Sequence, residues 1–290
     1  MKKILVTGAS GQLGQCLRQQ LQNSTNISCY FATKEDLDIT NNEAVKGFFS
    51  EHNFDYCINT AAYTNVEKAE SEQKMAFLVN AEGAHNIAKA CNEHNVVLLH
   101  ISTDYVFDGT KETPYQEKDP TNPLNVYGAS KLKGEQYIST SCSKHFIIRT
   151  SWLYSLYGHN FLNSMLQFAT QKKALTITTQ QKGTPTNAND VAQILITIIK
   201  TGNTRYGVYH FSNQGEGTWY DFARAIFKAT GEIDSVNLAK TKHYPTFAKR
   251  PNYSVLNCNK VQVTFNNKCS HWEDSLKDLI QKTNGAKSHL

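Results

Sequence analysis

No CxxC pair occurs among the seven cysteines of the sequence, which argues against a zinc site and a disulfide framework. The cysteine count is odd and several cysteines lie inside apolar runs, so we expect free thiols in a reducing cytoplasm. No stretch approaches the roughly 18 apolar residues of a membrane span. The apolar run before Gly8 is also too short for a signal peptide. We predict a cytoplasmic protein without a membrane anchor.

The sequence has no block of Lys and Arg, since its basic residues are scattered and the net charge is only +5. This pattern argues against nucleic acid or an anionic membrane as a partner. A mild positive balance suits an anionic small-molecule substrate. Internal repeats and low-complexity linkers are also missing. A length of 290 residues, 40% hydrophobic and 19% charged, is that of an ordinary globular protein with one or two domains.

Strand and helix patterns alternate through the first half of the chain. Short apolar runs predict strands at residues 2–8, 27–32, 55–62 and 96–102. Helical spacing predicts helices at residues 11–23, 41–53 and 72–93, the second capped by Thr40 or Asn41. Alternation with short connections is typical of a parallel sheet covered by helices on both faces. The predicted class is α/β, with a doubly wound, Rossmann-type parallel sheet.

The second half is less regular. Pro114, Pro120 and Pro123 mark an irregular loop. Beyond it we expect helices at 126–140, 160–171, 188–200, 218–230 and 271–283, and strands near 145–150, 175–178 and 207–211. We place a dinucleotide-binding domain at residues 1–150, to which later helices return. A smaller C-terminal α/β domain, mainly for substrate binding, is expected at residues 151–290.

The stretch "TGASGQLG" places Gly8, Gly11 and Gly14 directly after the first strand and at the start of a helix. This is the context of a dinucleotide fingerprint, because glycines let the backbone approach a pyrophosphate and a helix N-terminus favours its charge. The spacing is GxxGxxG, not the commoner GxGxxG. A plain glycine turn is the alternative, but the strand–helix units that follow favour a dinucleotide.

The end of the second strand bears on which dinucleotide binds. An acidic residue there would accept the ribose hydroxyls of NAD. This chain has Thr33 and Lys34 at that point, and its acids Glu35, Asp36 and Asp38 come later. Because a lysine can meet a 2′-phosphate, we expect NADPH as the cofactor, with NADH tolerated. The alternative is that Lys34 is an ordinary solvent-exposed side chain with no role in binding.

The stretch "VYGASKLKGE" gives Tyr127 and Lys131, which share a face if the segment is helical. A nearby lysine ammonium favours the tyrosine phenolate, and the pair can exchange a proton between alcohol and ketone. Thr103 ends the fourth predicted strand, where its hydroxyl can bond the substrate oxygen. An isolated YxxxK match is often just a pair of surface side chains. Here a dinucleotide-type strand–turn–helix lies upstream, which favours a catalytic role for the pair.

Motifs in order along nearly the whole chain resemble those of the extended short-chain dehydrogenases/reductases. Within these they are similar to the dTDP-4-dehydrorhamnose reductase family. The motifs are "TGASGQLG", "AAYTNVEKAE", "STDYVFDG", "NPLNVYGASKLKGE", "RTSWLY", "GTPT", "GVYHFSNQGEGTWYDFA" and "RPNYSVL". The resemblance implies an NAD(P)H-dependent oxidoreductase that reduces the 4-keto group of dTDP-4-dehydro-L-rhamnose. The product would be dTDP-L-rhamnose, for bacterial surface polysaccharide.

The glycine turn and the resemblance together give the candidate site residues. Tyr127, Lys131 and Thr103 are the expected catalytic residues. Cofactor contacts are expected at Gly8, Ser10, Gly11, Gln12, Leu13, Gly14, Asp38, Ile39, Ala61, Ala62, Tyr63, Tyr127 and Lys131. Substrate contacts are expected at Thr103, Asp104, Trp152, Asn160 and Arg250. Core packing is the alternative for Trp152, helix capping for Asn160 and a surface position for Arg250. Asn80 is expected to be structural.

Some members of the family bridge a homodimer with magnesium through acidic residues. Cys16 falls where one such carboxylate would lie, and a thiol does not suit Mg²⁺. We therefore predict no metal and leave a homodimer open.

Other activities of the same fold are also open. A 4,6-dehydratase would have Thr-Asp-Glu where this chain has Thr103-Asp104-Tyr105, so dehydration is disfavoured. The alternatives are another nucleotide-sugar reductase or epimerase, and a non-catalytic subunit resembling the regulatory subunit of methionine adenosyltransferase. Stoichiometric bound NAD would favour an epimerase, and co-purification with a synthetase would favour the subunit.

Overall fold

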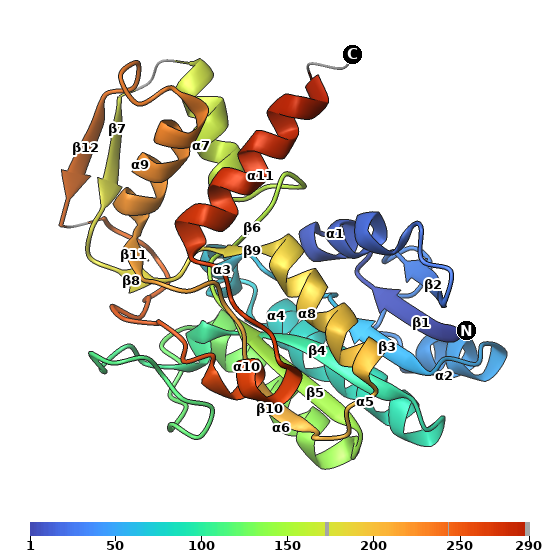
Figure 1. The fold of residues 1–290 in the computed structure, drawn as a ribbon. Helices are drawn as coiled ribbons and strands as arrows, with labels where there is room; N and C mark the ends of the chain where they lie inside the picture. The colour runs from blue at the N-terminus through green and yellow to red at the C-terminus, as the bar shows by residue number, and fades with distance from the viewer. Residues whose placement is uncertain (172–173, 243, 288–290) are drawn as a thin grey trace.

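The computed structural model describes residues 1–171, 174–242 and 244–287. Its centre is a six-stranded sheet in which each strand is parallel to its neighbours (Figure 1). The order is β10-β5-β4-β3-β1-β2. The strands are β1 (Lys2–Thr7), β2 (Ile27–Ala32), β3 (Tyr56–Asn59), β4 (Val97–Thr103), β5 (His145–Thr150) and β10 (Gly207–His210). The prediction of a doubly wound parallel sheet is confirmed.

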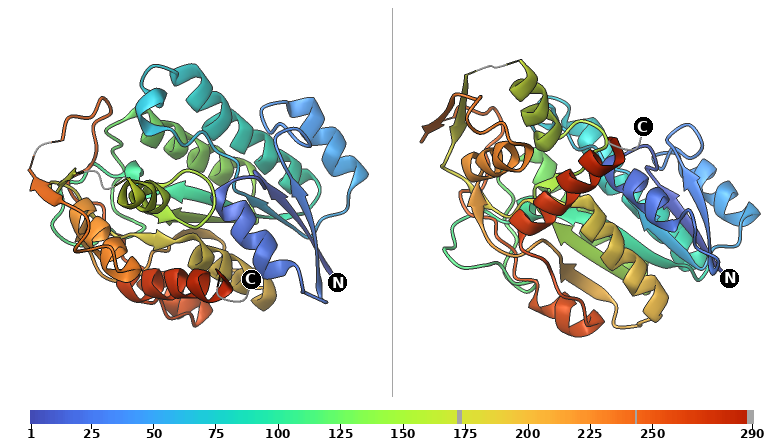
Figure 2. Two further views of the ribbon diagram at one scale, coloured as in Figure 1. Left: turned by 90° about the horizontal axis from the view of Figure 1, so that it is seen from above. Right: turned by 45° about the horizontal axis from the view of Figure 1, so that its top comes forward.

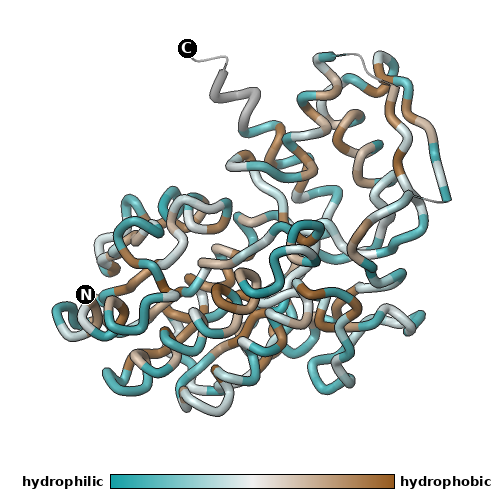
Figure 3. The backbone as a smooth tube through the Cα atoms, turned by 180° about the vertical axis from the view of Figure 1, so that it is seen from behind, coloured by the Kyte–Doolittle hydropathy of each residue, from teal (hydrophilic) through white to brown (hydrophobic). Residues whose placement is uncertain are grey.

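Helices cover both faces of this sheet (Figure 2). One face packs against α1 (Gln12–Leu21), α8 (Ala188–Thr201) and α10 (Asn259–Phe265), and the other against α2 (Asn42–Glu51), α5 (Ala84–Glu93) and α6 (Val126–Ser141). Alternate residues of a strand point to opposite faces, so Ile4 and Val6 of β1 join one core while Leu5 joins the other. Burial on both faces explains the apolar runs of these strands, visible as hydrophobic segments inside the larger lobe (Figure 3).

The helix predicted at 72–93 is helical throughout but changes its winding. It comprises α4 (Gln73–Phe77), a π-helical segment η1 (Leu78–Gly83) and α5, and the short α3 (Val66–Ala69) precedes it. Asn80 in the π segment accepts the backbone N–H of Tyr63 at 2.8 Å and donates to the Ser130 hydroxyl at 3.0 Å. Its structural role agrees with the sequence expectation. Single π turns inside helices are frequent near functional sites.

Residues after 150 build a second lobe around its own core. Phe222, Ile226 and Trp272 are among its buried residues. Its elements are β6 (Leu153–Tyr154), α7 (Phe161–Thr170), β7 (Leu175–Thr178), β8 (Lys182–Gly183), β9 (Thr186–Asn187), β11 (Gly217–Thr218), α9 (Trp219–Thr230), β12 (Leu238–Thr241) and α11 (Trp272–Lys287). Between these elements α8, β10 and α10 return to the first lobe (Figure 1).

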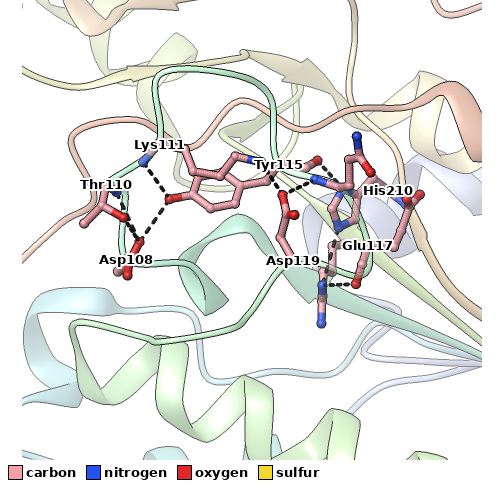
Figure 4. A network of polar contacts seen from close by, with 9 residues as sticks. Asp108, Thr110, Lys111, Tyr115, Glu117, Asp119 and His210 are labelled. Atoms are coloured by element: carbon pink, nitrogen blue, oxygen red, sulfur yellow. Dashed lines mark hydrogen bonds and ion pairs between the residues drawn. The ribbon is translucent and has the colours of Figure 1, made fainter.

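The proline-containing loop between the short helix η2 (Asp104–Val106) and α6 is tied to the sheet by buried polar contacts (Figure 4). Arg149 on β5 donates to Glu135 on α6 through Nε at 2.9 Å and Nη2 at 2.7 Å. The His210 backbone N–H on β10 donates to Glu117 at 3.0 Å. His210 Nδ1 lies 3.0 Å from the carbonyl oxygen of Tyr115. The Arg149–Glu135 bonds fix α6, and with it the predicted catalytic pair, against β5, while the His210 contacts hold the loop to β10.

Over the described parts of the chain, no helix combines the length and the apolar character that crossing a membrane requires.

Candidate active site

A cleft of about 880 Å³ lies at the carboxyl ends of β1, β3, β4 and β5. The strand order reverses between β1 and β3, and ligands of doubly wound sheets bind at such a point. Residues of the second lobe close the other side of the cleft. Of the predicted site residues, the lining contains Gly8, Ser10, Gly11, Gln12, Leu13, Asp38, Ile39, Ala61, Ala62, Tyr63, Thr103, Asp104, Tyr127, Lys131, Trp152, Asn160 and Arg250. The sequence therefore anticipated which residues the fold brings together, with Gly14 the exception.

The glycine-rich turn opens α1 at the floor of this cleft. Gly8 has a φ of +66°, and a Cβ there would lie 2.6 Å from the backbone nitrogen of Ala61. Gly11 precedes the first turn of α1, and no side chain caps that helix end. Its first backbone N–H groups are therefore available to an anion. Gly14 lies outside the lining, and a Cβ there would lie 2.7 Å from Ala9 Cα. It allows close packing, and the turn fits a pyrophosphate.

Lys34 and Asp38 line the cleft beyond the end of β2. Lys34 is exposed at the rim of the cleft. Asp38 accepts from the Thr40 hydroxyl at 2.7 Å and the Thr40 N–H at 2.9 Å, and the hydroxyl bond holds the pKa of Asp38 below its usual range. Asp36 accepts from the backbone and hydroxyl of Thr33. Both acids keep their negative charge but are bonded to local donors, whereas Lys34 is a positively charged side chain that lines this rim.

Tyr127 and Lys131 lie on the face of α6 that looks into the cleft. Asn125 caps α6 by accepting the Gly128 N–H at 2.7 Å, and a Cβ on Gly128 would lie 2.2 Å from the Tyr105 carbonyl oxygen. The helix therefore begins tightly against the end of β4. Burial raises the pKa of Tyr127 to about 12, and a hydrogen bond with Thr103 opposes this effect. The sequence favoured a phenolate, but in the cleft as it stands burial outweighs the hydrogen bond with Thr103, and Tyr127 keeps its proton.

Lys131 is only 2% exposed. Its Nζ donates to the carbonyl oxygen of Ile101 at 2.6 Å and lies 3.3 Å from Nε2 of His100. Burial lowers the pKa of Lys131 to about 8, and the charge of Glu135 opposes this. Lys131 can therefore exchange its proton near neutral pH.

Asp104 follows β4 directly and is only 2% exposed. Its Oδ1 accepts from the Thr103 hydroxyl at 3.1 Å, and its buried Oδ2 has no partner at full hydrogen-bond geometry within the described chain, although the Ser254 hydroxyl lies close enough to lower the pKa of this carboxyl. Burial raises the pKa of Asp104 to about 7. A buried carboxylate oxygen without a partner at the edge of a cleft is a strong acceptor for hydroxyl groups of a ligand.

Trp152 forms an aromatic wall on the second-lobe side. Its φ of +43° is unusual for a large residue and costs of order 1 kcal/mol. Its ring stacks on Trp219, with centroids 3.7 Å apart and planes within 6°. A Cβ on Gly183 would lie 2.5 Å from Trp152 Cε2. The Trp152 ring is thus held in place and lines the cleft, so core packing alone does not describe it.

Asn160 and Arg250 each have a partner within the protein. Asn160 caps α7 by accepting the Asn163 N–H at 3.1 Å, as the capping alternative predicted, and also donates to Gln12 at 3.0 Å. Arg250 Nη2 pairs with Glu67 at 2.6 Å, while its buried Nε has no partner among the residues described. The Arg250 side chain is therefore anchored at the cleft and keeps one donor free.

The description "RmlD substrate binding domain" names a family whose sequence pattern matches residues 1–284. This chain belongs to that family. A dTDP-4-dehydrorhamnose reductase of Aggregatibacter actinomycetemcomitans is 41% identical over 289 residues, covering 96% of this chain and 98% of that protein.

Solved structures of the RmlD family also superpose on the chain. The dTDP-4-dehydrorhamnose reductase of Clostridium acetobutylicum is 38% identical with a TM-score of 0.92, covering 97% of this chain and 99% of that one. The dTDP-4-dehydrorhamnose reductase of Bacillus anthracis, in complex with NADP, is 36% identical with a TM-score of 0.92, covering 97% and 100%. The family predicted from the motifs is confirmed.

Two residues in or beside this RmlD-family cleft escaped the sequence analysis. Trp219 stacks on Trp152, yet its local signal, a capping box of Thr218 and Asp221, predicts only a helix start. Glu67 pairs with Arg250 from a distant part of the chain, and no local pattern could have indicated this.

Cys16 lies on α1 and is fully buried, and burial raises its pKa to about 12. Residues 1–171, 174–242 and 244–287 contain no group of three or more His, Cys, Asp or Glu placed to hold a metal ion.

Proposed function

We propose that this protein catalyses the NADPH-dependent reduction of the 4-keto group of dTDP-4-dehydro-L-rhamnose. The product is dTDP-L-rhamnose, a precursor of bacterial surface polysaccharide. The observation that carries this proposal is that Tyr127, Lys131 and Thr103 line one cleft with the glycine-rich turn before α1, in a chain of the RmlD family. The named reductases to which the chain is similar support the same reaction.

Cofactor binding would rest on the turn between β1 and α1. Gly8 and Gly11 let the backbone approach a pyrophosphate, and the uncapped start of α1 supplies donors. Lys34 at the rim would meet the 2′-phosphate, which favours NADPH while NADH is tolerated. The similar enzyme of Bacillus anthracis was crystallised with NADP, which supports this choice. Bound NADPH supplies the hydride of the reduction.

Proton transfer would fall to Tyr127. Reduction requires a group that still carries its proton when the alkoxide develops. Because burial holds the pKa of Tyr127 at about 12, its hydroxyl stays protonated near neutral pH. Thr103 would hold the same substrate oxygen by a hydrogen bond. Lys131, whose pKa burial lowers to about 8, would adjust the charge beside Tyr127 and restore its proton.

The sugar nucleotide would lie between the two lobes. The free Oδ2 of Asp104 would accept from a sugar hydroxyl, and the Trp152 ring would pack against the sugar. Arg250, whose side chain lines the cleft, would meet the diphosphate. Asn160 would act mainly by holding α7 to Gln12 beside the cofactor turn.

We also propose the division into a cofactor domain at residues 1–150 and a mainly substrate-binding domain at residues 151–290, with α8, β10 and α10 belonging to the first. The cytoplasm is the proposed compartment, because the seven cysteines are free thiols. A homodimer stays a prediction, which light scattering on the purified protein tests.

The experiment that tests the proposed function is NADPH oxidation by the purified protein with freshly generated dTDP-4-dehydro-L-rhamnose. Oxidation that depends on the sugar and forms dTDP-L-rhamnose is expected, with NADH oxidised at a lower kcat/KM. Tyr127→Phe is the matched control, because it removes only the hydroxyl. No sugar-dependent oxidation, from protein shown to bind NADPH, would contradict the proposal and favour another keto-sugar or a non-catalytic role.

A further inference from the structure

A chain of buried polar side chains runs beneath the catalytic helix. The Thr7 hydroxyl on β1 donates to Asn59 Oδ1 on β3 at 2.7 Å. Asn59 Nδ2 lies 3.1 Å from Nδ1 of His100 on β4, and His100 Nε2 lies 3.3 Å from Nζ of Lys131 on α6. None of these four residues is more than 2% exposed. This series of polar contacts therefore connects Lys131 to β1, the strand that leads into the glycine-rich turn.

The neighbours of Asn59 fix the direction of these hydrogen bonds. Asn59 Oδ1 also accepts the backbone N–H of Ala61 at 3.3 Å, and a backbone N–H can only donate. Asn59 Nδ2 must then face His100 and donate to its Nδ1. Burial lowers the pKa of His100 well below its usual value, and a protonated Lys131 lowers it further, so the ring is neutral in either charge state of Lys131. Its single proton therefore lies on Nε2, facing Lys131.

An Nε2–H group and an ammonium group are both donors, so they cannot bond to each other. The contact is favourable when Lys131 is a neutral amine, whose lone pair accepts from His100 while an N–H donates to Ile101. When Lys131 gains a proton, His100 must carry its own proton on Nδ1 instead, with no change in ring charge. The amide of Asn59 must then turn over, which removes its bond with the Ala61 N–H.

Other ionisable groups also face the pair. Glu135, one turn further along α6, favours the Lys131 ammonium, but both of its oxygens are bonded to Arg149. His145 on β5 acts on His100 with the same sign as Lys131. Tyr127 lies one turn before Lys131 on α6 and is affected by Asp104. None of these replaces the direct contact between Lys131 and His100.

We propose that His100 is a positioning residue that couples the charge of Lys131 to the backbone of Ala61, just beyond the end of β3, through the amide of Asn59. The catalytic consequence rests on the proposed function, in which Lys131 serves the reduction. The coupling itself does not, because it is a property of the protein at rest. Protonation of Lys131 changes the His100 tautomer and the bonding at Ala61, which lines the cofactor part of the cleft.

The direct test is ¹⁵N NMR of the histidine side chains in the intact protein, with His100 assigned through its own backbone. We expect the Nε2–H tautomer at about pH 9.5 and the Nδ1–H tautomer at about pH 6.5, with a neutral ring throughout. The same tautomer at both ends of this range, or a ring that becomes charged, would overturn the proposal. This measurement needs no substrate, so it stays informative if the proposed reaction is wrong.

His100→Gln tests the consequence for catalysis. An amide oxygen at this position accepts from the ammonium, so Lys131 should keep its proton to higher pH. We expect the alkaline limb of the kcat profile to move up by about one pH unit, with KM for NADPH within about twofold of wild type. Leu98→Met, also on β4, is the control. It perturbs packing but not the series of hydrogen bonds, and should leave the alkaline limb of the kcat profile at its wild-type pH. An unmoved limb in His100→Gln would overturn the coupling, whatever happens to the maximal rate.

Discussion

Asp104→Asn should stabilise the folded protein at alkaline pH while impairing the proposed reaction. Asp104 is only 2% exposed, and its Oδ2 has no partner at full hydrogen-bond geometry within the described chain. Burial raises its pKa from 3.8 to about 7. At about 1.4 kcal/mol for each pH unit, this carboxylate costs up to roughly 4 kcal/mol of folding free energy once it is ionised. Asparagine has the same shape and removes the charge.

The pH dependence follows from the sign of the shift. The folded-state pKa is raised above its value in the unfolded chain, so the folded protein holds this proton more tightly. Its contribution to stability is present below about pH 4 and is lost as pH rises to about 7. The advantage of Asp104→Asn over wild type should therefore grow across this window by up to roughly 4 kcal/mol. An unpaired amide in place of the Asp104 carboxyl would cost the same free energy at both pH values, so it cancels when the two stability differences are compared.

Urea unfolding of wild type and variant at about pH 4.5 and pH 8.5 measures this difference. Asp108→Asn is a matched control of opposite sign. Burial raises the pKa of Asp108, but hydrogen bonds from Thr110, Asn122 and Tyr115 outweigh it and hold this pKa below its usual range. That variant should lose stability by nearly the same amount at both pH values, because the lowered pKa of Asp108 lies below both of them. A stability difference for Asp104→Asn that stays constant or shrinks as pH rises refutes the reasoning.

Three further changes test separate parts of the site. Tyr127→Phe should lower kcat about 100-fold or more while leaving the Kd for NADPH nearly unchanged, and parallel losses in turnover and calorimetric binding would contradict its role. Lys34→Ala should raise KM about tenfold for NADPH but little for NADH, and equal effects on both would place Lys34 outside the 2′-phosphate site. Gly183→Ala should displace Trp152, since the added Cβ would lie 2.5 Å from its ring. The substitution should lower the free energy of unfolding, measured in urea, by about 1 to 3 kcal/mol. It should also raise KM for the nucleotide sugar but not for NADPH, and an unchanged KM would argue against packing of the sugar on Trp152.

The elements that the sequence predicted well are those whose burial is complete or whose ends carry local signals. The strand at 96–102 is buried on both faces and reads as one apolar run. Asn41 and Asn160 cap helices through bonds to residues three positions ahead, which a sequence pattern can show. The glycine-rich turn and the Tyr127 helix are signals of the same local kind.

What could not be predicted depends on contacts between distant segments. The π segment at 78–83 is held by bonds from Asn80 to Tyr63 and Ser130, so its winding is set by tertiary structure. The Trp152–Trp219 stack joins two elements of the second lobe, and neither neighbourhood indicates the other. His100 was read as part of an apolar strand.

The hydrogen-bond partners of buried polar residues such as His100 are fixed by the alignment of neighbouring strands in the sheet. Asn59 and His100 are directly opposite in the register of β3 and β4, which brings the amide to the imidazole. Nothing in either strand's own sequence marks this pair.

The most direct test of the central claim follows the hydride itself. NADPH carrying deuterium at its reactive carbon is incubated with the protein and dTDP-4-dehydro-L-rhamnose, and the sugar product is examined by mass spectrometry and NMR. We expect one deuterium at C4 of dTDP-L-rhamnose, and loss of this product with Tyr127→Phe. Deuterium retained on the cofactor, or found at another carbon of the sugar, would contradict the assignment of a 4-keto reductase.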